Sequence, residues 1–301
     1  MESIKERLVS YQESYKKIDD DIREKISTGI LPYEQLVGYA AAEGNLKMLE
    51  TAFQKDQDNS AIIFAAALKG RIEVLQWAKD KQCDFPVTID TMAAAYRQLN
   101  VLIWLSERNF PKHLATFDAA VLIEDIELLS CLKHNNYPWN ERTCVKAVVF
   151  RKFASLKWLR ENGCPWDIET FNAAATIGNF EILEYLKENH CPRNARTLEA
   201  AASKGHIEVI KWLRKNGCPW NIAIKNNISN IAADKGHLEI LKWLRREGHK
   251  QTLDVTYIVV QRGQLHILRW LEKKGVYISA RDLEKCKKKS DKRAKAMIKI
   301  K

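Results

Sequence analysis

The sequence predicts an all-α fold in which pairs of helices are stacked one after another. The phrase LKWLRENGCPW at residues 156–166 returns as IKWLRKNGCPW at residues 210–220 and begins again as LKWLRREG at residues 241–248. Each unit between such phrases holds two stretches with helical spacing of apolar residues and none with the alternation of a strand. A protein stacked from equivalent units needs the same packing residues at every interface, whereas an enzyme has little use for three copies of one site.

Aromatic residues mark the period along most of the chain. Equal steps in both directions from Trp158 give intervals of 26, then five of 27, then 31, then 27 residues. A fixed spacing between about 20 and 50 residues is typical of repeat arrays. The 31-residue step predicts a four-residue insertion, which we interpret as a longer polar loop within residues 221–230. The markers are Thr51, Trp77, Trp104, Cys131, Trp158, Tyr185, Trp212, Trp243 and Trp270.

One unit illustrates how its two helices are recognised. In residues 169–179, ETFNAAATIGN, Thr170 is the expected N-cap, three alanines favour helix, and Gly178 ends it in a left-handed turn. In residues 180–194 apolar residues three and four apart predict a second, amphipathic helix. Small residues on the first helix let neighbouring pairs approach to about 8 Å. The marker on the second helix is then placed to fill the seam with the next unit.

These units resemble the ankyrin repeat. The pattern AAxxGHLEILKWLxxxG appears as AASKGHIEVIKWLRKNG at residues 201–217 and as AADKGHLEILKWLRREG at residues 232–248. Nine units cover about residues 38–278, and the likeness is blurred where Arg97, Glu124 and Arg151 replace the turn glycine. The GCPW variant is similar to short, divergent arrays of large DNA viruses of amoebae and of protists. The resemblance therefore implies an ankyrin-like solenoid in a viral or protist protein.

Two departures from the ankyrin pattern affect the expected fold. The period is 27 residues, where the usual unit has about 33 residues including a β-turn. We therefore expect the β-hairpins between units to be trimmed or absent. The TPLH opening is also missing: its proline position is taken by Thr170 and Thr197, and its histidine position by Asn172, Glu199 and Asn230.

Four cysteines occupy one repeat position: Cys83, Cys164, Cys191 and Cys218. Stacked units would hold their Cα atoms about 10 Å apart, beyond the limit of about 7 Å for a disulfide and too far for a shared zinc ion. We expect them to be core residues, because unpaired cysteine is among the most buried residue types. The chain has seven cysteines and no CxxC pair, which suits a reducing compartment.

No residue pattern points to catalysis, a cofactor or a metal. The sequence lacks HExxH, GxSxG, GxGxxG and GxxxxGK motifs. The resemblance implies that His206 and His237, directly after the turn glycine, stabilise loops, while His266 is expected at the surface. We therefore expect no enzymatic activity, no cofactor and no metal.

Charge and hydropathy restrict the compartment and the partners. Residues 281–301 carry ten Lys or Arg against three Asp or Glu, so +7 of the net charge of +11 lies there. The remaining +4 is too small to indicate a polyanionic partner along the body of the chain. No stretch approaches the roughly 18 apolar residues of a membrane helix, and the first residues contain no signal-peptide core. We expect a protein of the cytoplasm, the host's if viral, or of the nucleus.

Both ends of a repeat array need a cover over apolar surface. Residues 1–38 are predicted to form a helical cap, with residues 31–36 as the turn into about nine repeats at residues 39–278. Residues 279–301 are predicted to be a basic cap or a degraded tenth repeat with Met297 at the marker position. The other interpretation is a basic tail for nucleic acid, an acidic partner or nuclear import. Its basic residues are Lys285, Lys287, Lys288, Lys289, Lys292 and Arg293.

The residues just before each turn glycine are the candidate binding surface, because the resemblance implies that they project into a concave groove. The apolar candidates are Tyr96, Leu122, Ile123, Val149, Phe150 and Ile177, and the basic ones are Lys69, Lys204, Lys235 and Arg262. Two interpretations stay open. The apolar residues form an exposed patch with a basic border, or the units that lack the turn glycine pack differently and bury them.

The function expected from these observations is that of a non-catalytic scaffold for protein–protein interaction. The apolar patch would supply affinity and the basic border orientation. The alternative is binding of nucleic acid or an acidic partner through the basic C-terminal segment, with an affinity that falls steeply with salt. We expect a monomer with an unidentified protein partner.

Overall fold

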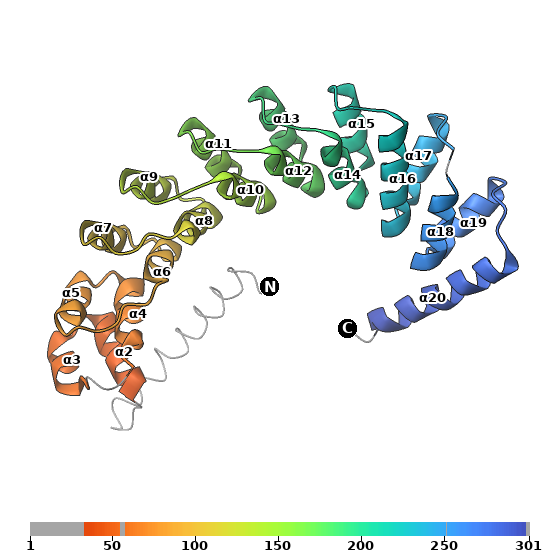
Figure 1. The fold of residues 1–301 in the computed structure, drawn as a ribbon. Coiled ribbons are helices and arrows are strands. Elements are labelled where there is room, and N and C mark those ends of the chain that lie inside the picture. Colours follow the sequence, from red (N-terminus) through yellow and green to blue (C-terminus); the bar gives the residue numbers. More distant parts are fainter. Residues whose placement is uncertain (1–32, 55–57, 251, 299–301) are drawn as a thin grey trace. The chain divides into compact units, whose positions relative to one another are not determined.

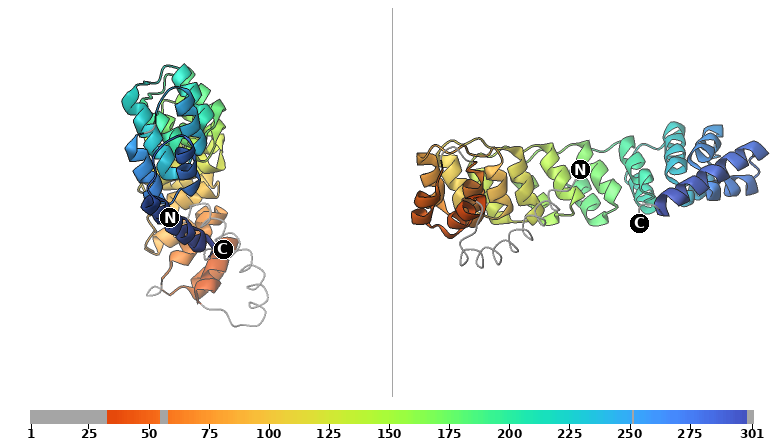
Figure 2. Two further views of the ribbon diagram at one scale, coloured as in Figure 1. Left: turned by 90° about the vertical axis from the view of Figure 1, so that its right-hand side faces the viewer. Right: turned by 90° about the horizontal axis from the view of Figure 1, so that it is seen from below.

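The computed structural model describes residues 33–54, 58–250 and 252–298, and every regular element within these ranges is a helix (Figure 1). The chain forms two compact units, Met1–Cys164 and Pro165–Lys301. In each unit a first and a second helix alternate, and the two kinds of helix form two rows (Figure 1). Figure 2 shows the same helices from two further directions. No strand occurs in the described ranges, so turns stand in place of hairpins. The predicted all-α stack of helix pairs is confirmed.

The first unit contains five helix pairs within its described residues. Its first helices are α2 (Tyr33–Glu43), α4 (Ser60–Lys69), α6 (Ile89–Ala95), α8 (Leu114–Ile123) and α10 (Glu141–Val149). Its second helices are α3 (Leu46–Ala52), α5 (Ile72–Asp80), α7 (Leu99–Glu107), α9 (Ile126–His134) and α11 (Phe153–Glu161).

The described residues of the second unit form four helix pairs and one longer helix at its end. Its first helices are α12 (Ile168–Ile177), α14 (Ala195–Ser203), α16 (Ile222–Lys235) and α18 (Leu253–Arg262). Its second helices are α13 (Phe180–Glu188), α15 (Ile207–Lys215), α17 (Leu238–Arg246) and α19 (Leu265–Lys273). The chain then continues into α20 (Ala280–Ile298). No helix in the described ranges is long and apolar enough to span a membrane.

Alanine-rich first helices pack directly on one another. Ala66 of α4 is fully buried where α4 lies between α2 and α6, and Ala201 of α14 is fully buried between α12 and α16. A side chain no larger than a methyl group allows two helix axes to approach to the short end of the usual range. These seams form the continuous core of each unit.

All nine marker residues lie on second helices, as the period predicts. In several repeats the marker ring packs against an aromatic residue that ends the preceding repeat. The ring centroids of Trp139 and Trp158 are 6.0 Å apart, and those of Trp220 and Trp243 are 5.5 Å apart. The tryptophan of the CPW phrase therefore belongs to the seam with the next repeat.

In many repeats the residue directly after the turn residue forms a hydrogen bond, through its side chain, with the preceding repeat. In the first unit Gln98 Nε2 donates to the carbonyl of Leu68 at 2.8 Å. In the second unit His206 Nε2 donates to Thr176 O at 3.0 Å, and His237 Nε2 donates to Ser203 O at 3.1 Å. These carbonyls belong to the last turns of first helices, where the helix supplies no partner. His206 and His237 therefore make the contacts that their predicted loop-stabilising role requires.

The structure corrects two local predictions. The N-cap of α12 is Asp167, whose side chain accepts from Glu169 N, so the prediction of Thr170 is wrong. Thr170 is fully buried, because the helix begins earlier and turns that residue inward. The four-residue insertion lengthens α16 to 14 residues and forms no longer loop. It adds a helical turn because Asn221 caps the helix and Ile224 and Ile228, four residues apart, are both buried.

The start of the array also differs from the prediction. Residues 33–36, expected in a turn, form the beginning of α2, and the buried Val37 extends its packed face. A helix beginning at Tyr33 covers apolar surface of α4 that a turn would leave exposed. The rest of the cap predicted for residues 1–38 lies outside the described residues.

Two glycines allow a matched test of the link between repeats. Gly205 and Gly217 both have left-handed backbones, with φ of +80° and +84°. A Cβ on Gly205 would lie 2.8 Å from His237 Nδ1, whereas a Cβ on Gly217 would meet nothing within 4 Å. We expect Gly217→Ala to lower the free energy of unfolding by about 1 kcal/mol, the left-handed strain alone. We expect Gly205→Ala to cost about 1 kcal/mol more, because it displaces the His237 hydrogen bond.

Urea unfolding followed by circular dichroism measures both changes. In a His237→Ala background the two glycine variants are expected to become equal in cost. Equal costs already in the natural background would contradict a stabilising role of the histidine link.

Candidate functional site

Five apolar side chains gather where three first helices of the first unit end. Tyr96 is the C-cap of α6, Leu122 and Ile123 are the last residues of α8, and Val149 and Phe150 end α10. Helix α6 packs against α8, and α8 against α10, so these ends lie side by side (Figure 1). Val149 is 47% exposed and Phe150 40% exposed, while the other three are half-buried. We call these five residues the central patch.

The turns behind the central patch keep the glycine conformation without glycine. Arg97, Glu124 and Arg151 have φ values of 57°, 58° and 58°. This left-handed geometry costs an ordinary residue about 1–2 kcal/mol, so surrounding contacts must hold it. Because the turns are kept, α6, α8 and α10 end in the same way as the first helices of the glycine-containing repeats.

Ion pairs join the repeats around the central patch. Arg97 Nε lies 2.5 Å from Asp125 Oδ2, and Lys152 Nζ lies 3.8 Å from Glu124 Oε2. Asp125 also caps α9 by accepting from Leu128 N at 3.1 Å. The charged pair thus replaces the link made elsewhere by histidine or glutamine.

A further ion pair crosses from α10 to α8, where Lys146 Nζ donates to Asp118 Oδ2. Burial raises the pKa of Asp118, and the hydrogen bond from Lys146 partly opposes that rise. The residues close to the central patch are therefore mainly charged pairs that satisfy one another.

The remaining predicted binding residues are placed differently. Lys69 is exposed at the end of α4 in the first unit, and Lys204 is exposed as the C-cap of α14 in the second. Ile177 is half-buried at the end of α12, in the second unit.

Lys235 and Arg262, expected as cations facing a partner, share one carboxylate. Lys235 Nζ lies 2.9 Å from Asp234 Oδ2, and Arg262 Nε binds Asp234 Oδ1. The hydrogen bonds from Lys235 and then Arg262 lower the pKa of Asp234, which keeps it ionised. The sequence alone does not reveal that Asp234 neutralises much of the positive charge of Lys235 and Arg262.

The basic C-terminal segment forms a single helix, α20, that packs against α18 and α19. Cys286 is fully buried, and Lys289 Nζ donates to the carbonyl and the side chain of Gln261 at 2.9 and 2.8 Å. Lys288 pairs with Glu284 at 2.6 Å, while Lys285 and Lys287 are exposed. The side chains of Lys292 and Arg293 lie outside those that the structure describes. Since α20 is unbroken to Ile298, the alignment of Met297 with a second-helix marker is wrong.

No disulfide joins the seven cysteines, all of which lie in the described ranges. Cys164, Cys191 and Cys218 are buried and Cys83 is half-buried, so the core prediction holds for three of the four. Cys83 differs because it lies closer to solvent beside Asp84. A hydrogen bond with Cys144 and burial raise the pKa of Cys164, an adjacency that the repeat spacing did not reveal. In the described part of the chain no three His, Cys, Asp or Glu residues are grouped as a metal site.

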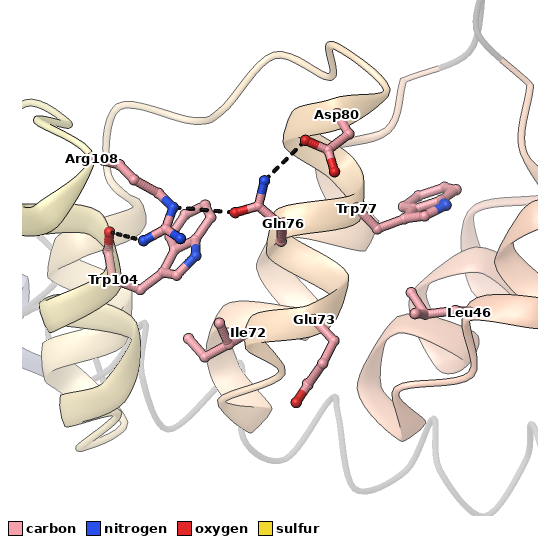
Figure 3. A pocket seen from close by; sticks show the side chains of 8 residues that line it. All are labelled: Leu46, Ile72, Glu73, Gln76, Trp77, Asp80, Trp104 and Arg108. Carbon is pink, nitrogen blue, oxygen red and sulfur yellow. Dashed lines mark hydrogen bonds between the residues drawn. The ribbon is translucent and has the colours of Figure 1, made fainter.

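Shallow hollows lie between second helices. In the first unit a hollow of about 500 Å³ lies along α5 (Figure 3). Arg108 lies over the Trp104 ring at 4.6 Å and donates to Gln76 at 3.2 Å, and Gln76 donates to Asp80 at 2.9 Å. Arg108, Gln76 and Asp80 thus bind one another across the hollow, which leaves few of its polar groups for a ligand.

Two similar hollows between second helices of the second unit are lined mainly by basic residues. They lie between α15 and α17 and between α17 and α19, with volumes of about 430 and 460 Å³. The sequence signal for them is the KWLR phrase, which places a lysine before and an arginine after the marker. As a packing motif the phrase predicts buried apolar residues but does not predict this basic face.

Comparisons with known proteins agree with this architecture. Residues 198–245, which run from α14 to α17, match the family model of ankyrin repeats present in many copies. This segment is thus similar in sequence to ankyrin repeats. Each unit is thus an all-α, ankyrin-like stack of helix pairs, as predicted.

Among solved structures, the human ASB11 ankyrin repeat domain is similar with a TM-score of 0.47 and 19% identity, over 62% of this chain and 99% of that one. The maize pentatricopeptide repeat protein PPR10 is similar with a TM-score of 0.36 and 15% identity, over 88% of this chain and 45% of that one. At these TM-scores neither structure carries an argument about this chain. A search of curated proteins gives no match.

Thiol reactivity tests the placement of the cysteines. Cys144, Cys164, Cys191, Cys218 and Cys286 are buried, and burial raises the pKa of Cys218 and Cys286. We expect a chromogenic disulfide reagent at mildly alkaline pH to modify at most Cys83 and Cys131 rapidly, because only a deprotonated, accessible thiol reacts. All seven cysteines should react after unfolding in urea. Rapid modification of any of the five buried thiols, located by mass spectrometry, would contradict this placement.

Proposed function

We propose that this protein is a non-catalytic scaffold that binds a partner protein through the ends of its first helices. The observation that carries the proposal is the central patch, where Val149 and Phe150 are exposed beside three half-buried apolar side chains. Aromatic side chains are enriched in the cores of protein interfaces, and a polar rim usually surrounds them. The ankyrin repeats at residues 198–245 support a role in protein binding.

The charged pairs around the central patch favour specificity over bulk affinity. Arg97 has a side chain that is 63% exposed, so a partner carboxylate can approach it without breaking its bond to Asp125. Charges at the rim of an interface mainly affect orientation and association rate. The partner we propose is therefore a protein segment with apolar anchors and flanking acidic residues. Lys69 in the first unit and Ile177, Lys204, Lys235 and Arg262 in the second remain proposed contacts.

The alternative, binding of nucleic acid or an acidic partner through the basic C-terminal segment, has less support. Cys286 and Lys289 engage α18, which favours a role of α20 as the cover of the array. We also propose a monomer in the cytoplasm or nucleus, without a cofactor, from a large DNA virus of amoebae or a protist.

The proposal predicts a selective loss of binding. The tagged full chain is purified from its native cells, and the protein that co-purifies is identified and titrated. We expect Phe150→Asp to weaken that complex by about 30-fold or more, because loss of a central anchor costs about 2 kcal/mol before any charge is buried.

The matched control is Leu253→Asp, which places the same charge on an apolar side chain that is 85% exposed in the second unit. Leu253 begins α18, where an acidic residue suits the helix dipole. Thermal unfolding should be similar for both variants. A partner that binds both variants equally well would overturn the proposed site.

A further inference from the structure

A groove between α17 and α19 in the second unit is lined by five cations and one tryptophan. Lys242, Arg245 and Arg246 come from α17, and Trp270 and Lys273 come from α19. Lys274, the C-cap of α19, completes the lining, and no acidic residue takes part. We call these six residues the basic groove. Second helices form it, so it lies on a different row from the first-helix ends described above (Figure 1).

The neighbouring groove shows that this charge is not a requirement of the fold. Between α15 and α17 the lining includes Glu247, whose carboxylate lies 2.5 Å from Arg214. Glu247 follows Trp243 by four residues, as Lys274 follows Trp270. At one equivalent position, the acidic residue that pairs with an arginine of the first groove is replaced by a lysine in the second.

Most of the positive charge in the basic groove is uncompensated. Lys242 pairs with Glu239 at 2.7 Å, and Arg245 donates to the carbonyl of Lys274 at 3.0 Å. Arg246, Lys273 and Lys274 are exposed and form no ion pair with the described residues. Cations in the last turn do stabilise a helix through its dipole, but the second helix α3 ends without one and has Phe53 as its C-cap. Dipole compensation therefore does not explain a cluster of five.

Trp270 differs from the other marker tryptophans. The ring of Trp243 packs against Trp220, that of Trp158 against Trp139 and that of Trp104 against Phe85. The position equivalent to Trp220 in the repeat before Trp270 is Gln251, which lies outside the described residues. No aromatic ring of the described residues lies against Trp270, and its side chain is only partly buried. An indole without an aromatic neighbour thus lies among uncompensated cations.

We propose that the basic groove binds single-stranded nucleic acid, with backbone phosphates on Arg246, Lys273 and Lys274 and a base stacked on Trp270. Proteins that bind single strands combine a positive groove with aromatic side chains on which bases stack. An acidic peptide would use the cations but would leave the indole without a role. Nucleic acid uses both features, and this decides between the two classes of partner.

Fluorescence anisotropy of the full chain with a fluorescein-labelled oligothymidine of about 15 nucleotides tests the proposal at about 50 mM salt. We expect Arg246→Gln with Lys273→Gln to weaken binding at least tenfold. The slope of log affinity against log salt should fall by about 1.4, since each single-strand phosphate contact contributes about 0.7. The charge-matched control is Lys285→Gln with Lys287→Gln, two exposed lysines of α20 that should change affinity less than threefold.

Trp270 separates stacking from charge. Trp270→Leu is expected to lose about tenfold in affinity, while Trp270→Phe retains most of it because a ring can still stack. Thermal unfolding of each variant verifies the fold. If the leucine variant does not fold, the binding of the Arg246→Gln, Lys273→Gln variant decides whether the proposal holds.

Three results would overturn the proposal. The first is no binding by the natural chain at about 50 mM salt. The second is equal loss in the groove and α20 variants, which would mean non-specific attraction to the whole charge. The third is displacement of the oligonucleotide by polyglutamate together with unchanged affinity of Trp270→Leu, which would identify an acidic protein segment as the ligand.

Discussion

Contact between successive first helices, made through small side chains, is the interaction on which the rest of each unit depends. Ala66 and Ala201 are fully buried in such seams. A lone helix pair would expose apolar surface on both sides, so each pair is stable only against its neighbours. Close approach of the first helices also brings the turn loops near enough for His206 and His237 to reach carbonyls of the preceding repeat. The surfaces at the helix ends and between second helices follow from the same stacking.

The links between turns exist in two chemical forms that suit different turn residues. His237 reaches back to the turn of the preceding repeat. The turn residue there is Gly205, because a Cβ at that position would collide with the histidine ring. Where the turn residue is Arg97, the residue that reaches back to it from the next repeat is Asp125. Its side chain is shorter than that of histidine, and the two residues form an ion pair. The repeats around the central patch thus replace a neutral hydrogen bond by charged pairs. This exchange keeps the stack intact while it changes the chemistry of the exposed helix ends.

Period and helical spacing predicted the helix pairs, because those signals repeat nine times and report the packed face directly. Local details were less predictable. Thr170 and Asp167 are both good N-caps, and only the packing that buries Thr170 decides between them. Exposure of Val149 and Phe150 depends on left-handed turns at residues that lack glycine, for which sequence carries no signal. The sharing of Asp234 by two cations and the facing of Lys274 into a groove depend on how helices are rotated, which spacing alone does not specify.

Hydrogen exchange of an Ala201→Leu variant tests nearest-neighbour stacking most directly. A larger side chain in that seam should cost about 1–3 kcal/mol by overpacking. If each repeat depends only on its neighbours, amide exchange should accelerate in α12, α14 and α16 and their second helices, while α2 to α8 exchange as in the natural chain. Equal acceleration in α2 to α8 would mean that the chain shares one cooperative core, and would contradict this account.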